Sequence, residues 1–150
     1  MRAFGLPMGP FEAQDLAGLD IAAAMRAASR ARGETVFAPV ADRLVAAGRL
    51  GQKAGCGWYD YEPGDRAPRP SDEVAEIIAD EAAKAGIERK DLSTETIQRA
   101  ILAPMVAEGR QIVADGIAAS PAAVDLVEIL GFGFPRWRGG LMHWGEAAGI

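Results

Sequence analysis

Two glycine-dense segments constrain this chain more than any other feature of its sequence. They are GLPMGPFEAQDLAGLD, at residues 5–20, and GRLGQKAGCGWYDY, at residues 48–61. The first leads into apolar, helix-forming sequence and the second into aromatic residues, which is not the pattern of a disordered linker. Glycines in such a setting mark tight turns, or places where another backbone or a ligand comes close. We therefore expect both segments to be ordered parts of a fold.

Apolar residues elsewhere recur at helical spacing, between glycines and prolines that suit helix ends. Gly18 is expected to break the first helical segment, and Pro104 to kink the long helix that contains it. The only extended segment is expected at residues 58–61, so the chain is predicted to be all-α. The predicted helical segments cover residues 11–32, 39–47, 72–85, 94–115, 121–130 and 141–148.

Residues 62–70, EPGDRAPRP, form the clearest linker in the chain. Three prolines, one glycine and four charged residues in nine positions cannot sustain a helix or bury much surface. Ser71 follows as an expected N-cap, with Asp72 and Glu73 in the positive first turn of the next helix.

Composition and charge exclude several classes of protein. The chain has 150 residues, 49% hydrophobic and 25% charged, with a net charge of −5. This is a globular composition without the basic patch of a nucleic-acid-binding protein. No apolar stretch approaches the roughly 18 residues of a membrane span, and the N-terminus lacks the apolar segment of a signal peptide. Cys56 is the only cysteine, so no internal disulfide is expected. We expect a cytoplasmic protein.

The two ends of the chain resemble each other. Gly5-Leu6-Pro7, leading to Gly9, matches Gly133-Phe134-Pro135, leading to Gly140. Each loop precedes a short helical segment that meets a glycine, Gly18 in the first case and Gly149 in the second. The pattern predicts an internal duplication, with a small insertion around Trp137 in the second loop.

The glycine-dense segments resemble one family, the C-terminal domain of L-3-hydroxyacyl-CoA dehydrogenases, the NAD-dependent enzymes of fatty-acid β-oxidation. The family patterns are similar to GxPMGPFELxDxVGLD and GxLGxKTGxGFYxY. The matching residues here are Gly5, Pro7, Met8, Gly9, Pro10, Phe11, Glu12, Asp15, Gly18, Leu19 and Asp20, then Gly48, Leu50, Gly51, Lys53, Gly55, Gly57, Tyr59 and Tyr61.

The second half resembles the second of two tandem copies in the multifunctional members of that family, of the alpha-subunit type. Its pattern there is similar to PMxxExxxxxxxGIAxSxxxxDxxxxxGxGFPxxxGG. The residues that match are Pro104, Met105, Glu108, Gly116, Ile117, Ala118, Ser120, Asp125, Gly131, Gly133, Phe134, Pro135, Gly139 and Gly140. The resemblance covers nearly the whole chain, in the order of the family.

The resemblance implies an all-α fold like the C-terminal domain of 6-phosphogluconate dehydrogenase, in two related copies of which the first is truncated. The first copy would span residues 1–61, the linker 62–70 and the second copy 71–150. The family's catalytic His–Glu pair and its substrate-binding Asn would lie outside this chain. We therefore predict no catalytic, metal-binding or cofactor-binding residue here, and NAD only in the parent enzyme.

The remaining candidates for chemistry are read as structural. Gly131-x-Gly133-x-x-Arg136 lacks the third glycine and the preceding strand of a dinucleotide site, and the turn at residues 51–57 lacks the ending of a phosphate loop. His143 has no evident catalytic partner, and Cys56 has no evident base. Glu108 is expected to be buried and hydrogen-bonded, and Arg136 and Arg138 to be a solvated pair.

Four residues are predicted to lie on the substrate side. In the family, the loop that contains Pro7 and Met8 faces the cleft between domains and lines the acyl-CoA site. Ala13 stands where the family usually has Leu, which would loosen that wall. Leu130 precedes the second GxGFP motif, at a place that lies near substrate in multifunctional enzymes. These side chains would supply shape and apolar surface, not reactivity.

The leading hypothesis is the C-terminal helical portion of a multifunctional 3-hydroxyacyl-CoA dehydrogenase, inactive by itself. Its expected partners are acyl-CoA, a Rossmann NAD-binding domain, a second copy in a homodimer and a thiolase subunit. A truncated first copy would leave an apolar face to be covered. The alternatives are a free-standing helical module for interaction or dimerisation, without catalysis, and an independent acyl-CoA binder.

Overall fold

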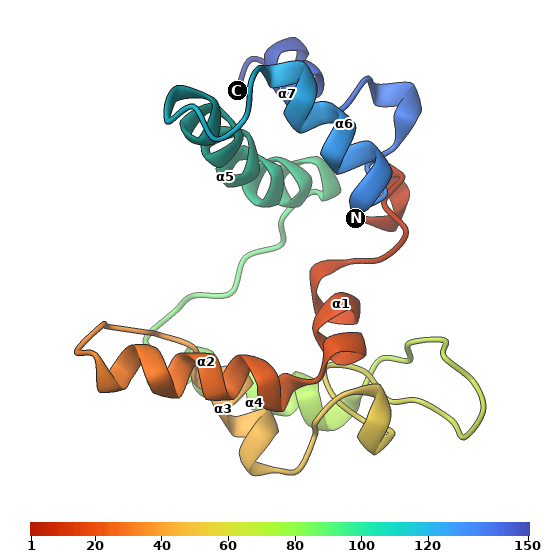
Figure 1. The fold of residues 1–150 in the computed structure, drawn as a ribbon. Helices are drawn as coiled ribbons and strands as arrows, with labels where there is room; N and C mark the ends of the chain where they lie inside the picture. Colours follow the sequence, from red (N-terminus) through yellow and green to blue (C-terminus); the bar gives the residue numbers. More distant parts are fainter. The chain divides into compact units, whose positions relative to one another are not determined.

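The computed structural model describes residues 1–150, which form two compact units. The terminal unit combines Met1–Met8 with Asp91–Ile150, so both chain ends belong to it (Figure 1). The central unit is Gly9–Lys90.

The chain is all-helical, as the sequence predicts. The central unit holds four helices, and the terminal unit holds three. The only extended pairings are isolated bridges among Gly51, Cys56, Asp60 and Arg69. No helix combines the length and the apolarity that crossing a bilayer requires. The helices are α1 (Pro10–Ala17), α2 (Leu19–Ala31), α3 (Pro39–Ala46), α4 (Asp72–Lys84), α5 (Thr94–Ala114), α6 (Pro121–Gly131) and α7 (Leu141–Ala147).

Glycine and polar caps set the helix ends. Gly18 separates α1 from α2 with a φ of 100°, in the region that side-chain-bearing residues rarely adopt. Gly9 precedes α1, and its N–H donates to the carboxylate of Glu12 at 2.7 Å. Ser93 and Ser120 cap α5 and α6 through their hydroxyls. Ser71 stands at the N-cap position of α4, but its side chain makes no capping hydrogen bond.

The core of the central unit lies where α2, α3 and α4 pack together. Its buried apolar side chains are Leu19, Leu44, Val74 and Ile77. Helix α4 thus packs with the first predicted copy, although the sequence assigns it to the second. Compact units in a structure and duplicated copies in a sequence can have different boundaries. The division into a first copy ending at residue 61 and a second copy starting at residue 71 therefore stays a prediction.

The core of the terminal unit gathers around Phe4, near the start of the chain. Its ring makes edge contacts with Phe134 and Trp144, at centroid distances of 5.6 and 5.3 Å. Leu102 and Val106 of α5 complete this cluster with Leu141. Helix α5 runs continuously from Thr94 to Ala114, so Pro104 does not end it.

The two loops that resemble each other in sequence pack against each other within the terminal unit. A Cβ on Gly5 would lie 3.0 Å from Pro135, and a Cβ on Gly133 would lie 3.0 Å from Pro7. Each glycine therefore faces the proline of the other loop. Both glycines have positive φ values, 113° and 74°, so backbone conformation and close approach both favour glycine there.

The Phe4→Ala substitution is expected to destabilise the terminal unit by about 3–5 kcal/mol, because it removes a buried aromatic side chain that packs on Phe134 and Trp144. Phe132→Ala is the matched control: Phe132 is 67% exposed and Phe4 only 2%. The control should change the free energy of unfolding by less than about 0.5 kcal/mol. Urea titrations followed by circular dichroism measure both. Equal, small effects would show that the N-terminal segment does not anchor this core.

Candidate functional site

A buried carboxylate, Asp15 of α1, organises the central unit. Its side chain is 1% exposed. One oxygen accepts the N–H of Trp58 at 2.8 Å, and the other accepts the N–H of Tyr59 at 3.0 Å and the hydroxyl of Tyr61 at 2.8 Å. Three donors from one short segment satisfy a group that would otherwise be costly to bury. They fix this segment to α1.

The second glycine-dense segment is explained by its approach to Asp15. A Cβ on Gly57 would lie 2.0 Å from the Asp15 carboxylate, and a Cβ on Gly51 would lie 2.3 Å from the Asp15 carbonyl oxygen. Gly51 and Gly57 are therefore placed directly against Asp15, where a side chain on either residue would clash.

Arg49 ties the same turn to α4. Its side chain is buried, and its Nε donates to the carbonyl oxygen of Gly57 at 2.8 Å. Its two other nitrogens donate to Asp60 at 2.6 Å and to Glu73 at 2.9 Å. One guanidinium thus holds the turn, the extended segment and the first turn of α4 together.

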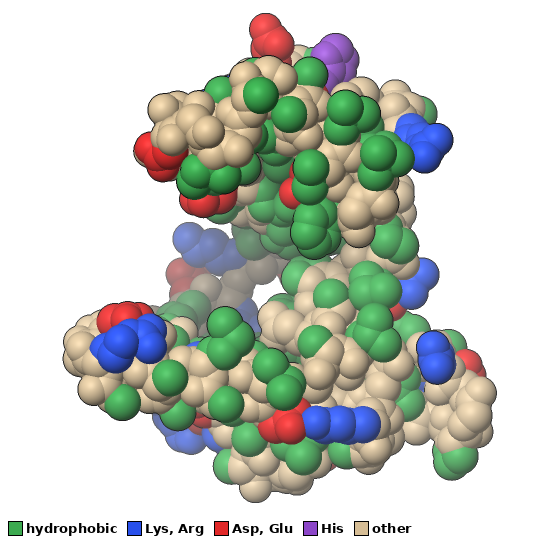
Figure 2. Space-filling view, viewed as in Figure 1, with side chains coloured by type: hydrophobic (Ala, Val, Ile, Leu, Met, Phe, Trp, Pro, Cys, Tyr) green, Lys and Arg blue, Asp and Glu red, His purple; other side chains and the backbone are tan.

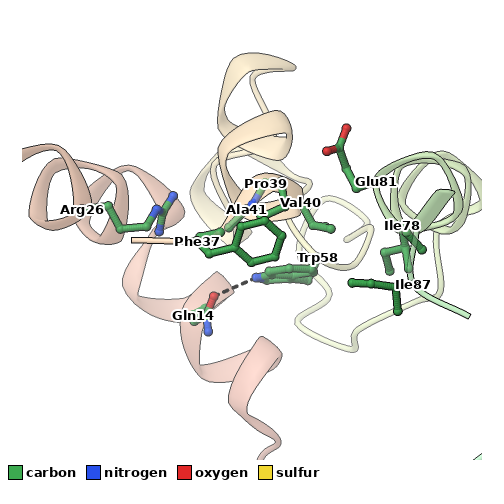
Figure 3. Close-up of a pocket in the computed structure, with 12 residues that line it drawn as sticks. Gln14, Arg26, Phe37, Pro39, Val40, Ala41, Trp58, Ile78, Glu81 and Ile87 are labelled. Atoms are coloured by element: carbon green, nitrogen blue, oxygen red, sulfur yellow. Dashed lines mark hydrogen bonds between the residues drawn. The ribbon is translucent and has the colours of Figure 1, made fainter. Parts of the chain in front are cut away.

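Beside this polar centre, the central unit has an apolar pocket of about 470 Å³ (Figure 3). Phe37, Val40, Trp58, Ile78 and Ile87 supply most of its wall. The indole nitrogen of Trp58 donates to Gln14 at 2.9 Å, and Phe11 stacks on the same indole with a centroid distance of 4.3 Å. The tryptophan therefore lines the pocket with ring surface and without a free donor.

Two charged side chains, Arg26 and Glu81, also line this pocket. The Nε of Arg26 donates to Asp42 at 2.8 Å, whereas its Nη2 is buried and has no hydrogen-bond partner. Glu81 is held by Arg43 at 3.0 Å and by Lys84 at 2.8 Å. The pocket thus offers one unsatisfied buried donor in an apolar setting.

The four predicted substrate-side residues are divided between the units. Pro7, Met8 and Leu130 belong to the terminal unit, where Pro7 lies against Gly133 of the loop that follows Leu130. Leu130 is 68% exposed, in an apolar stretch on α6 with Leu126 and Val127. Ala13 is an exposed residue of α1 in the central unit. Green apolar side chains are visible on the surface of both units (Figure 2).

A nicotinamide dinucleotide does not fit the loop at residues 131–136. This loop follows helix α6, not a strand, and Gly133 is in close contact with Pro7. No group of three or more potential metal-ligating side chains occurs in the chain.

Two predictions about single residues are wrong. Glu108 is exposed and not buried, and it borders a groove that Val124 and Glu128 of α6 also line. Arg136 is exposed as expected, but Arg138 is only partly exposed: it stacks on the rings of Phe4 and Trp137, and its Nε donates to the carbonyl oxygen of Phe4 at 2.9 Å. Its flat guanidinium covers the edge of the core.

The other single candidates lie in ordinary surroundings. Exposed His143 lies on α7, where its backbone N–H donates to Asp125 at 3.3 Å. Asp125 also accepts the N–H of Met142 at 2.6 Å, and a Cβ on Gly140 would lie 2.4 Å from it. Burial, and then the charge of Asp125, raise the pKa of Glu128 above its ordinary value. Cys56 is half-buried in the glycine-dense turn, with its sulfur 3.8 Å from the carbonyl oxygen of Ala54.

Comparison with known proteins places the first part of the chain in a family. The family model described as 3-hydroxyacyl-CoA dehydrogenase, C-terminal domain, matches residues 1–61. These residues belong to that family. The resemblance seen in the glycine-dense segments is thereby confirmed.

Relatives that match beyond residue 61 extend the likeness over the whole chain. Proteins named peroxisomal bifunctional enzyme from Homo sapiens and Danio rerio are 34% and 35% identical over 100% of it. The chain spans 23% of the length of these relatives. The solved dehydrogenase part of multifunctional enzyme 1 from C. elegans is 25% identical, with a TM-score of 0.67, over 89% of this chain and 30% of that one.

The close contact at Asp15 gives a prediction about the stability of the central unit. Gly57→Ala should destabilise it by about 1–3 kcal/mol, because the new methyl group must displace a buried carboxylate. Gly131→Ala is the control: nothing lies within 4 Å of the added Cβ, and the residue is helical with ordinary φ. It should be neutral or stabilising by up to about 1 kcal/mol. Urea titration of both variants decides, and a tolerated Gly57→Ala would contradict the packing described.

A further prediction concerns the stability of the protein at alkaline pH. Burial raises the pKa of the Tyr61 hydroxyl above its ordinary value of 10.0, and the hydrogen bond to Asp15 and its charge raise it further. The unfolded chain then loses this proton first, so stability is complete below about pH 10 and declines above it. Tyr61→Phe should weaken that decline. The free energy of unfolding, measured between about pH 8 and pH 11, tests this, and parallel curves would refute it.

Proposed function

We propose that this chain is the C-terminal helical portion of an NAD-dependent L-3-hydroxyacyl-CoA dehydrogenase of fatty-acid β-oxidation. The observation that carries the proposal is the alignment of the whole chain with multifunctional relatives, combined with the family match of residues 1–61. In that setting the chain shapes the acyl-CoA cleft and mediates packing between domains or subunits.

The reacting groups of the proposed enzyme lie elsewhere in the complete protein. The two glycine-rich loops of this chain are filled by its own side chains, Asp15 in one case and Pro7 in the other. We propose that NAD binds to a separate Rossmann domain, which is the first proposed partner. Pro7, Met8, Ala13 and Leu130 contribute apolar surface to the acyl-CoA side of the cleft.

Exposed apolar side chains support the packing role. Leu16 is 53% exposed on α1, and Ile21 and Met25 are 56% and 68% exposed one turn apart on α2. On α6, Leu126, Val127 and Leu130 are each more than half exposed. Surfaces of this kind usually meet another protein surface. A homodimer and a thiolase subunit are the further proposed partners. A cytoplasmic location stays a prediction, since the names of the relatives say peroxisomal.

A chimaera tests the proposal. The aligned part of the human relative is replaced by residues 1–150, and NADH oxidation with acetoacetyl-CoA is measured. We expect turnover by the chimaera and none by the chain alone at high concentration. Saturable turnover by the isolated chain would place the chemistry here and overturn the proposal. A folded chimaera without activity would favour the alternative, a helical association module without catalysis.

Variants of the chimaera test the substrate side. Met8→Lys is expected to raise the KM for acetoacetyl-CoA several-fold with a smaller change in kcat, because it alters binding surface and not a reacting group. Ile117→Lys is the control, since Ile117 is 76% exposed and carries no proposed contact. Equal kinetics in both variants would remove Met8 from the site.

A further inference from the structure

The apolar pocket of the central unit contains a polar defect that the proposed function does not use. Arg26 is 13% exposed, and its Nη2 is buried without a hydrogen-bond partner. Buried polar atoms in folded proteins almost always have a partner, and an exception calls for a water, an ion or a ligand. Figure 3 shows Arg26 at one end of the pocket, with the aromatic rings of Phe37 and Trp58 beside it.

The charges around the pocket favour an anion. Asp42 accepts from Arg26 at 2.8 Å and from Arg30 at 2.6 Å, so one carboxylate serves two guanidinium groups. On the other side, Asp80 and Glu81 balance Arg43 and Lys84. Arg26, Arg30 and Asp42 together carry one net positive charge, and of the two arginines only Arg26 lines the pocket. A singly charged ligand would neutralise that charge.

The residues that line the pocket indicate the chemistry of the uncharged part of the ligand. The pocket volume of about 470 Å³ lies within the range of small-molecule sites, and Val40, Ile78, Ile87 and the ring surface of Trp58 are apolar. A compact polar anion such as phosphate would leave these walls unused and would find only one free donor. A ligand with a single carboxylate and an apolar body satisfies both parts of the pocket.

We propose that the pocket between Arg26, Phe37 and Trp58 binds an amphiphilic carboxylate, with its charged group on Arg26 Nη2 and its apolar body against Trp58 and Ile87. Because Nη2 is sealed from water, a side chain must move to admit the ligand. Phe37 is the lining residue with the least packing to lose, since it is 73% exposed. The proposal concerns the central unit alone and stands apart from the dehydrogenase assignment.

Decanoate and 1-decanol, used below their aggregation limits, are the probes. Both are titrated into the full chain while the fluorescence of Trp58 is followed, with Trp58→Phe to subtract Trp137 and Trp144. We expect saturable binding of decanoate at least tenfold tighter than that of decanol, because only the carboxylate can accept from Arg26. Equal affinities, or no saturable binding of decanoate, would overturn the proposal. If neither probe binds, the pocket would instead be assigned to a polypeptide segment that packs into it.

Two substitutions separate the carboxylate contact from general adsorption. Arg26→Gln should abolish the tenfold preference and leave decanol binding unchanged. Arg32→Gln is the control, because Arg32 lies just beyond α2, is 62% exposed and pairs with Glu34. If Arg26→Gln does not fold, Phe37→Ser gives an independent reading from a residue outside the core: because this side chain must move to admit the ligand, its removal should speed association of both probes and keep the tenfold preference for decanoate, and slower association or a lost preference would refute the assignment. A preference that survives Arg26→Gln would refute the assignment.

Discussion

The carboxylate of Asp15 is the interaction on which the rest of the central unit depends. A charge buried to this degree is tolerable only when donors surround it, and three donors come from a single segment after the glycine-dense turn. That requirement leaves no room for side chains at Gly51 and Gly57. Arg49 then joins the turn to α4, and Trp58 is set as a wall of the apolar pocket. A small unit without a sheet gains its order from this polar centre.

The sequence was sufficient for the helices but not for the polar contacts. Apolar periodicity, Gly18 and the serine caps predict helix bounds within about two residues, because these signals are local. Asp15 and Arg49 gave no such signal, since a lone charge on a helix or turn usually faces water. For Glu108 the error was the opposite one: it was expected to be buried but is exposed. A position beside an apolar stripe does not determine whether a side chain on α5 is buried. The pocket around Arg26 was equally invisible, because its walls come from segments far apart in the sequence.

The family match and the two compact units divide this chain at different residues. The family match covers residues 1–61, yet Met1–Met8 fold into the terminal unit while α4 joins the central one. A segment from each predicted copy is thus buried with the other. The expected substrate-side residues came from family resemblance alone, and they fall on both units. Their role depends on the complete enzyme proposed above; the chain itself spans 23% of the length of its human relative.

The reciprocal contact of the two similar loops has a consequence for how such chains can change over generations. Gly5 packs against Pro135 and Gly133 packs against Pro7, so the shape of each loop limits which side chains the other can carry. A larger residue at either glycine would require a smaller or displaced partner across the contact. Related sequences should therefore show paired changes at these four positions.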